Sequence, residues 1–192
     1  MEEFRKFYDE VKSMSKKELV KAGIPKFVGM LNKAKEIGFA KIVKEFPDIT
    51  DVIRSKTAQF DVKEGINIIK TFMPIMFDTV VDYIDHNKEV QKEINELNNV
   101  SLTLALDDSD YAITILIKNG KFEYKLGYID KVDITLKMSK ATMQKFMTGD
   151  IDPMTAYMSG EVKAVGDINK LNELRSILNI VSEEFGFDLL TV

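Results

Sequence analysis

Side chains that could perform catalysis are sparse in this sequence. His86 is the only histidine and there is no cysteine, so a zinc site built from these two ligand types and a thiol nucleophile are both excluded. A serine nucleophile would need His86 as its base, yet no Gly-x-Ser-x-Gly turn exists to present the serine. His86 lies among Asp85, Asn87 and Lys88, on the polar side of a predicted helix. We expect it to be a solvated surface side chain.

The acidic residues offer no catalytic arrangement either. Asp107, Asp108 and Asp110 resemble part of a calcium-binding loop, but the glycine and the closing glutamate of an EF-hand loop are missing. For Asp130 and Asp133, the sequence shows no apolar setting that would raise the pKa of a carboxyl group, so acid-base work is unsupported. No glycine-rich phosphate loop occurs. We therefore predict that the protein is not an enzyme and uses no metal or cofactor.

The composition is that of an ordinary globular protein. Hydrophobic residues make up 45% and charged residues 30% of the 192 residues. No apolar run approaches the ~20 residues needed to cross a bilayer, and the first ten residues have no apolar stretch typical of a secretory signal. Together with the lack of cysteine, these features lead us to expect a cytoplasmic location. The net charge of −4 disfavours nucleic-acid binding.

The charges divide the chain into two parts. Residues 1–70 carry a net charge of +4, whereas residues 71–192 carry a net charge of −8. Such an asymmetry indicates two parts with different roles, or two parts that attract each other. We predict a helical N-terminal extension over residues 1–72 and a second domain over residues 73–192.

The N-terminal part has the signals of several helices. Ser15 has the spacing of a capping box with a glutamate three residues later, which predicts the start of a helix. Pro25 fits the first turn of a following helix, whose apolar residues recur at three- and four-residue steps until Pro47 ends it. A further helix should be stopped or kinked at Pro74. The pattern from Pro74 to Leu97 is again helical.

The period of the apolar residues changes from 3.6 to 2 at Asn98-Asn99. Apolar and polar side chains then alternate, as they do in strands with one buried face. The predicted strands span residues 100–106, 111–118, 121–126 and 132–138. Asn119-Gly120 is typical of a tight hairpin turn. Strands in a meander followed by helices predict an α+β domain with helices packed on one face of the sheet.

The segment after these strands, GDIDPMTAYMSGEVKAVGD over residues 149–167, is densely punctuated. Ser139 should cap a helix that ends at Gly149, and Asp152 followed by a proline should start a short helix that Gly160 stops. Residues 161–165 then form a fifth strand. Gly166 and Asp167 precede a last helix with apolar residues at helical spacing.

This order of elements resembles the sterol-carrier-protein family of nonspecific lipid-transfer domains. The resemblance covers roughly residues 75–185. The matching residues are Gly149, Asp152-Pro153, Ala156-Tyr157-Met158, Gly160, Val162-Lys163-Ala164-Val165 and Gly166-Asp167. It implies a five-stranded, mostly antiparallel sheet with helices over one face and a hydrophobic tunnel between them, preceded here by an all-helical extension. It also implies binding of sterols, fatty acids, acyl-CoAs or phospholipids without chemistry on them.

An apolar tunnel would suffice to bind such a ligand. A lipid tail gains about 0.8 kcal/mol per buried CH₂ group, and methionine suits a lining because it is unbranched and adaptable. The residues predicted to line the tunnel are Ile113, Ile115, Phe122, Phe146, Met147, Met154, Tyr157, Met158, Leu174, Ile177 and Leu178. Their expected role is apolar contact, with the Tyr157 hydroxyl available to a polar head group. The alternative is that the methionines are ordinary core residues.

Two further alternatives stay open from sequence alone. The protein could be an accessory module whose N-terminal helices dock a partner or mediate dimerisation, and a filled core without a tunnel would favour that function. The basic segment 12–44 could make transient contact with an anionic membrane, or it could be a helical cap with solvated lysines. The sequence names neither the ligand nor the oligomeric state.

Overall fold

The computed structural model describes residues 1–171, 174–175, 177, 179–180 and 183. The chain divides into two compact units, Met1–Thr79 and Val80–Val192, and the division falls within the long helix α6 (Val62–His86). Each unit is described separately below. The domain boundary expected between residues 72 and 73 stays a prediction.

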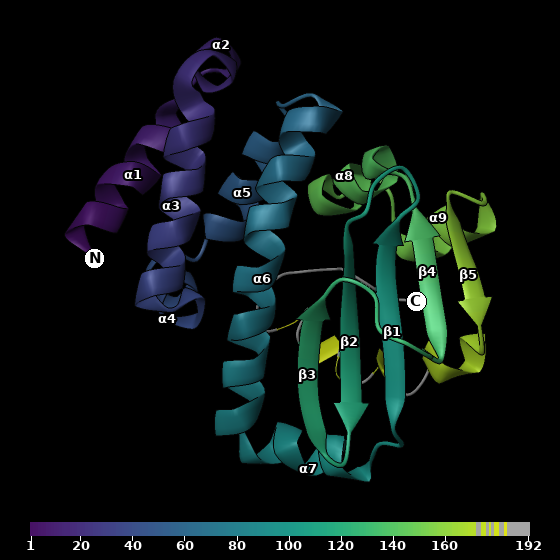
Figure 1. The fold of residues 1–192 in the computed structure, drawn as a ribbon. Coiled ribbons are helices and arrows are strands. Elements are labelled where there is room, and N and C mark those ends of the chain that lie inside the picture. The colour runs from purple at the N-terminus through teal and green to yellow at the C-terminus, as the bar shows by residue number, and fades with distance from the viewer. Residues whose placement is uncertain (172–173, 176, 178, 181–182, 184–192) are drawn as a thin grey trace. The chain divides into compact units, whose positions relative to one another are not determined.

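The first unit is helical (Figure 1). Its elements are α1 (Glu2–Ser13), α2 (Lys16–Glu18), the π-helical turn η1 (Leu19–Gly23), α3 (Ile24–Ile37), α4 (Phe39–Glu45), α5 (Ile49–Thr57) and the first part of α6. The predicted capping box is present, because the backbone N–H of Ser15 donates to the Glu18 carboxylate at 2.9 Å and the Ser15 hydroxyl accepts from the Glu18 N–H. The single helix predicted from Pro25 to Pro47 is interrupted. Gly38, with a φ of 93°, separates α3 from α4.

Aromatic side chains and one polar cluster hold the first unit together. The rings of Phe4 and Tyr8 both pack on Phe46, with centroids 5.0 and 4.7 Å apart. The Tyr8 hydroxyl and the Lys12 amine each donate to the carboxylate of Asp48, at 2.5 and 2.6 Å. These contacts fasten α1 to the segment that precedes α5.

The second unit begins within α6 and continues through α7 (Lys88–Glu96). The sequence predicts a helix break at Pro74 and one continuous helix over residues 74–97, but the structure breaks the helix elsewhere. Pro74 lies inside α6, which continues beyond it, and the break comes at Asn87. The Asn87 side chain accepts hydrogen bonds from the N–H groups of Glu89 and Val90, so it caps α7.

The sheet has five strands in the order β3-β2-β1-β4-β5. The strands are β1 (Val100–Leu106), β2 (Ala112–Lys118), β3 (Lys121–Leu126), β4 (Ile134–Met138) and β5 (Val162–Gly166). The central pair β1 and β4 is parallel and the other three pairs are antiparallel. The predicted α+β fold with a five-stranded, mostly antiparallel sheet is therefore confirmed.

The strand register places most of the buried apolar side chains of the five strands on one face, which we call the inner face. Directly opposite residues share a face, and Ile115 pairs with Leu102, which in turn pairs with Ile134. The buried inner-face residues are Val100, Leu102, Leu104, Leu106, Ile113, Ile115, Ile117, Phe122, Ile134, Leu136, Met138 and Val162. The residues that alternate with them form the outer face.

The chain between β3 and β4 must cross one face of the sheet, because β1 and β2 lie between these two strands. A hydrogen bond to Thr114, whose side chain is on the outer face, shows that it crosses that face. The hydroxyl of Thr114 donates to the carbonyl oxygen of Gly127 at 2.8 Å and lies 2.8 Å from the hydroxyl of Thr103. Both threonines are fully buried. Figure 1 shows this crossing in front of β2 and β1, with helices α8 (Lys140–Thr148) and α9 (Pro153–Met158) behind the sheet.

Candidate functional site

The strand residues predicted to line a tunnel lie together on the inner face. Ile115 pairs with Leu102 on one side, and Ile117, two residues further along β2, pairs with Phe122. Ile113 lies two residues before Ile115 and so faces the same side. The three predicted residues, Ile113, Ile115 and Phe122, are all buried. The structure therefore brings Ile113, Ile115 and Phe122 onto one apolar surface.

The predicted residues from the helices fall into two groups. Phe146 and Met147 of α8 are buried, as are Leu174 and Ile177. Leu178 lies outside the described residues. The three predicted residues of α9 face solvent instead, with exposed fractions of 40% for Met154, 45% for Tyr157 and 80% for Met158.

The buried side of α9 is formed by Ala156, which is fully inaccessible to solvent. Successive residues of a helix differ by about 100° in direction, so a helix of this length that turns Ala156 inward leaves most other side chains outside. It stays a prediction that the three α9 residues, the buried helix residues and the buried strand residues named above line a tunnel.

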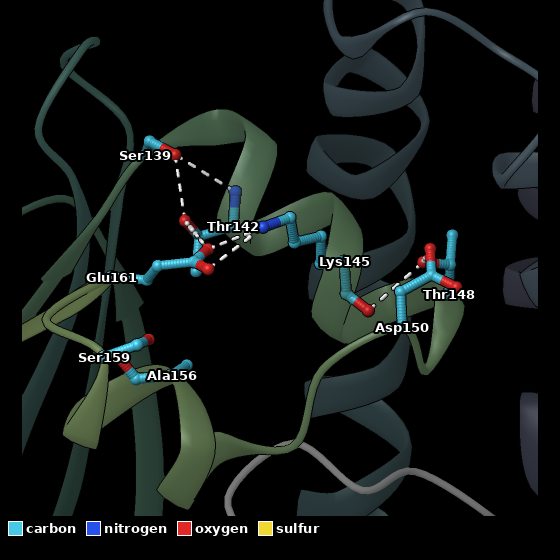
Figure 2. A network of polar contacts seen from close by, with 8 residues as sticks. All are labelled: Ser139, Thr142, Lys145, Thr148, Asp150, Ala156, Ser159 and Glu161. Atoms are coloured by element: carbon cyan, nitrogen blue, oxygen red, sulfur yellow. Dashed lines mark hydrogen bonds and ion pairs between the residues drawn. The ribbon is translucent and has the colours of Figure 1, made fainter.

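A polar network ties α8 to the residue that precedes β5 (Figure 2). The Ser139 hydroxyl accepts from the N–H of Thr142 at 3.1 Å and so caps α8. The Thr142 hydroxyl donates to the carboxylate of Glu161 at 3.2 Å. Lys145, one turn along the helix, donates to both oxygens of the same carboxylate at 2.9 and 3.0 Å. The hydrogen bond from Lys145 lowers the pKa of Glu161.

The turn between α8 and α9 is held by local hydrogen bonds. Gly149 ends α8 in the left-handed conformation, and the N–H of Asp150 donates to the Lys145 carbonyl oxygen at 2.8 Å. Asp152 then caps α9 by accepting from the N–H of Thr155 at 2.9 Å. Hydrogen bonds from the Thr155 side chain and backbone lower the pKa of Asp152. These hydrogen bonds position α8 and α9. The carboxylates of Glu161 and Asp152 serve as their acceptors.

The described residues do not form a metal-binding cluster, since no three of their histidine, cysteine, aspartate and glutamate side chains come together. Within the same residues, no helix combines the length and apolarity that crossing a bilayer requires.

Sequence reasoning missed some residues that shape this site. Alternation within residues 100–106 and 132–138 predicts one buried face for each strand. It does not show that Leu102 and Leu104 adjoin β2 on one side and β4 on the other. The ion pair between Lys145 and Glu161 joins residues sixteen positions apart and left no local signal. The cap at Ser139, by contrast, acts over three residues and was predicted.

A family model settles the relationship of the second unit. The model described as the SCP-2 sterol transfer family matches residues 81–179, which is more than half of the chain. The chain belongs to this family. The matched range contains the whole sheet together with α7, α8 and α9, and the sterol-carrier-protein resemblance read from the sequence is confirmed. The SCP-2 family comprises lipid-binding and lipid-transfer domains.

One curated relative is much longer than this chain. An (R)-specific secondary-alkylsulfatase from Pseudomonas sp is 28% identical over 112 residues, which are 58% of this chain and 16% of that protein. The chain therefore spans only a small part of that relative.

Solved structures to which the chain is similar include SCP-2 domains and an alkylsulfatase. Apo sterol carrier protein 2 from Yarrowia lipolytica is 20% identical, with 52% of this chain and 90% of that chain covered and a TM-score of 0.39. The stereoselective inverting sec-alkylsulfatase Pisa1 from Pseudomonas sp. is 16% identical, with 88% of this chain and 31% of that chain covered and a TM-score of 0.35.

Proposed function

We propose that this protein binds a hydrophobic ligand in an apolar tunnel between the inner face of the sheet and the helices over it, and that it carries or presents that ligand. The ligand would be a fatty acid, an acyl-CoA, a sterol-like molecule or another lipid. The observation that carries the proposal is the inner face itself, on which five strands of an SCP-2 family member present apolar side chains.

Apolar contact alone would give useful affinity. Each buried CH₂ group of a ligand contributes about 0.8 kcal/mol, and micromolar binding corresponds to about 8 kcal/mol. About ten buried CH₂ groups match this figure before the cost of immobilising the ligand is counted, so a longer acyl chain or a sterol-sized ligand is needed. Met138, Met143 and Met147 are buried and could adapt to ligands of different shape because their side chains are unbranched. Binding of this kind needs no catalytic group.

Native mass spectrometry of gently purified protein and displacement of a fluorescent fatty acid test the proposal. We expect a co-purified lipid in the spectrum and micromolar displacement. A Met147→Trp substitution should weaken displacement at least ten-fold, because the larger side chain would occupy ligand space. Val20→Trp, at an exposed position of the first unit, serves as the control and should leave displacement unchanged.

Circular dichroism of both variants separates loss of binding from loss of folding. A spectrum of ligand-free protein, combined with no displacement of the fluorescent fatty acid, would contradict the proposal. In that case an accessory module that docks a partner would become the better explanation, and light scattering and a pull-down would be the informative measurements.

A further inference from the structure

The outer face of the sheet carries a group of lysines that the proposed function does not use. They come from four strands of a unit that is acidic overall, and each is exposed. They are Lys118 on β2, Lys121 and Lys125 on β3, Lys137 on β4 and Lys163 on β5. All alternate with apolar inner-face residues, so they project from the opposite side of the sheet.

Four of these lysines face each other directly across neighbouring strands. Lys118 is the register partner of Lys121, and Lys137 is the register partner of Lys163. Like charges at directly opposite positions destabilise a sheet. None of the four forms an ion pair with a residue that the structure describes. The fold thus retains an unfavourable arrangement that a bound anion would relieve.

The two pairs differ in their neighbours. Glu123 lies between Lys121 and Lys125 on β3, so it offsets part of the charge there. Within the strands, the neighbours of the pair formed by Lys137 and Lys163 are Ala105, Thr135 and Val165, which carry no charge. Glu161, two residues before Lys163, forms its ion pair with Lys145 of α8. This second pair is therefore the stronger indication of an anionic partner.

Protection of sheet edges accounts for only some of these lysines. Charged side chains on edge strands prevent pairing with other chains, and β3 and β5 are the two edges of this sheet. Lys121, Lys125 and Lys163 fit that role. Lys118 and Lys137 lie on β2 and β4, which have a strand on each side and need no such protection.

Exposed apolar side chains accompany the lysines. Val165, with an exposed fraction of 59%, follows Lys163 on the same face of β5. Tyr128, with an exposed fraction of 56%, belongs to the segment that crosses the outer face. Lysine next to exposed tyrosine and aliphatic side chains suits the head-group region of a bilayer, where phosphates and apolar groups meet.

We propose that the outer face docks on an anionic phospholipid bilayer, with Lys137 and Lys163 at the centre of the contact. The exposed Tyr128 and Val165 favour a bilayer over nucleic acid as the partner, because the head-group region offers apolar groups beside its phosphates. This inference adds a membrane contact to the proposed lipid binding but does not depend on the tunnel.

The basic N-terminal segment is a separate candidate for membrane contact. Four of its nine lysines between residues 12 and 44, namely Lys12, Lys26, Lys33 and Lys35, form ion pairs with carboxylates of the first unit. The transient membrane contact expected from residues 12–44 stays a prediction.

Sedimentation with vesicles of phosphatidylcholine, with and without phosphatidylserine, tests the inference on the full chain. We expect binding to the phosphatidylserine vesicles that weakens as salt is raised. Each lysine near an anionic surface contributes about five-fold to the affinity, so the double variant Lys137→Gln/Lys163→Gln should bind roughly 30-fold more weakly. The control Lys88→Gln/Lys92→Gln removes the same charge from exposed positions of α7 and should bind as the unmodified protein does.

Three results would overturn the inference. The first is full vesicle binding by Lys137→Gln/Lys163→Gln, and the second is an equal loss in the control variant. The third is an absence of preference for phosphatidylserine, which would favour an acidic protein as the partner. Displacement of a fluorescent fatty acid by the same variant should be unchanged. That measurement separates failure of the docking surface from failure of the proposed lipid binding.

Discussion

Replacing Gly166 with alanine should severely destabilise the second unit. Gly166 ends β5 with a φ of 114°, a conformation that side chains rarely adopt. A Cβ atom at this position would overlap the carbonyl oxygen of Asp133 and lie 3.2 Å from the Cα of Ile134. That oxygen accepts a hydrogen bond from the N–H of Asp167 at 3.0 Å. The backbone of β4 therefore cannot move aside without weakening the pairing with β5.

The cost has two parts. The disfavoured backbone conformation costs about 1–3 kcal/mol, and the shift needed to relieve the overlap adds about 1–3 kcal/mol. Together they predict a loss of about 2–6 kcal/mol in the free energy of unfolding. Gly160→Ala is a matched control because Gly160 also has a positive φ, of 77°, but a Cβ there would meet nothing within 4 Å. That variant should lose only about 1–2 kcal/mol.

Urea-induced unfolding followed by circular dichroism measures both variants against the unmodified protein. The difference between the two variants isolates the close approach of β4 and β5 from the backbone conformation alone. Equal losses for Gly166→Ala and Gly160→Ala would refute the reasoning, because they would mean that the overlap with Asp133 is relieved without cost.

Three further predictions concern single polar groups. Hydrogen bonds from Lys12 and Tyr8 lower the pKa of Asp48. The ionised Asp48 carboxylate therefore stabilises the fold fully above its ordinary pKa of 3.8, and this stabilisation is lost as the pH falls through the lowered pKa. In thermal melts, acidification should lower the melting temperature of Asp48→Asn less than that of the unmodified protein. Thr114→Val leaves the carbonyl of Gly127 unpaired under the crossing segment and should cost about 1–3 kcal/mol in urea unfolding, whereas a loss below measurement error would show that water replaces the hydroxyl. Ser139→Ala removes the cap of α8 and should cost about 1 kcal/mol, and Ser139→Asp should restore the lost stability if capping is the cause.

The start of each capped helix could be predicted because the signal and the structure lie within a few residues. Ser15, Ser139 and Asp152 each bond to the N–H group that their position in the sequence indicated. The strands were predicted for the same reason, since alternation is a property of neighbouring residues. Two helix breaks were not predicted. Gly38 and Asn87 occur within sequences of helical periodicity, and nothing local shows that the chain turns there.

The arrangement of the site depends on contacts that sequence spacing does not encode. The position of β4 between β1 and β5 determines which apolar side chains adjoin Leu104, and the strands involved are separated by the hairpin of β2 and β3. The direction of α9 is a similar case. Its apolar residues Met154, Tyr157 and Met158 suggested a buried helix, but a helix of six residues can turn only one side inward, and that side is Ala156.

The strand order also has a consequence for how the sheet is made. Strand β1 lies at the centre, and its neighbour β2 follows after a short turn, whereas its other neighbour β4 is synthesised only after β3 and the crossing segment. Until β4 is available, one side of β1 presents unpaired backbone groups, which are a template for association with other chains. A nascent chain interrupted between residues 127 and 133 should therefore be more prone to aggregate than one that stops after β4, although the latter still lacks β5.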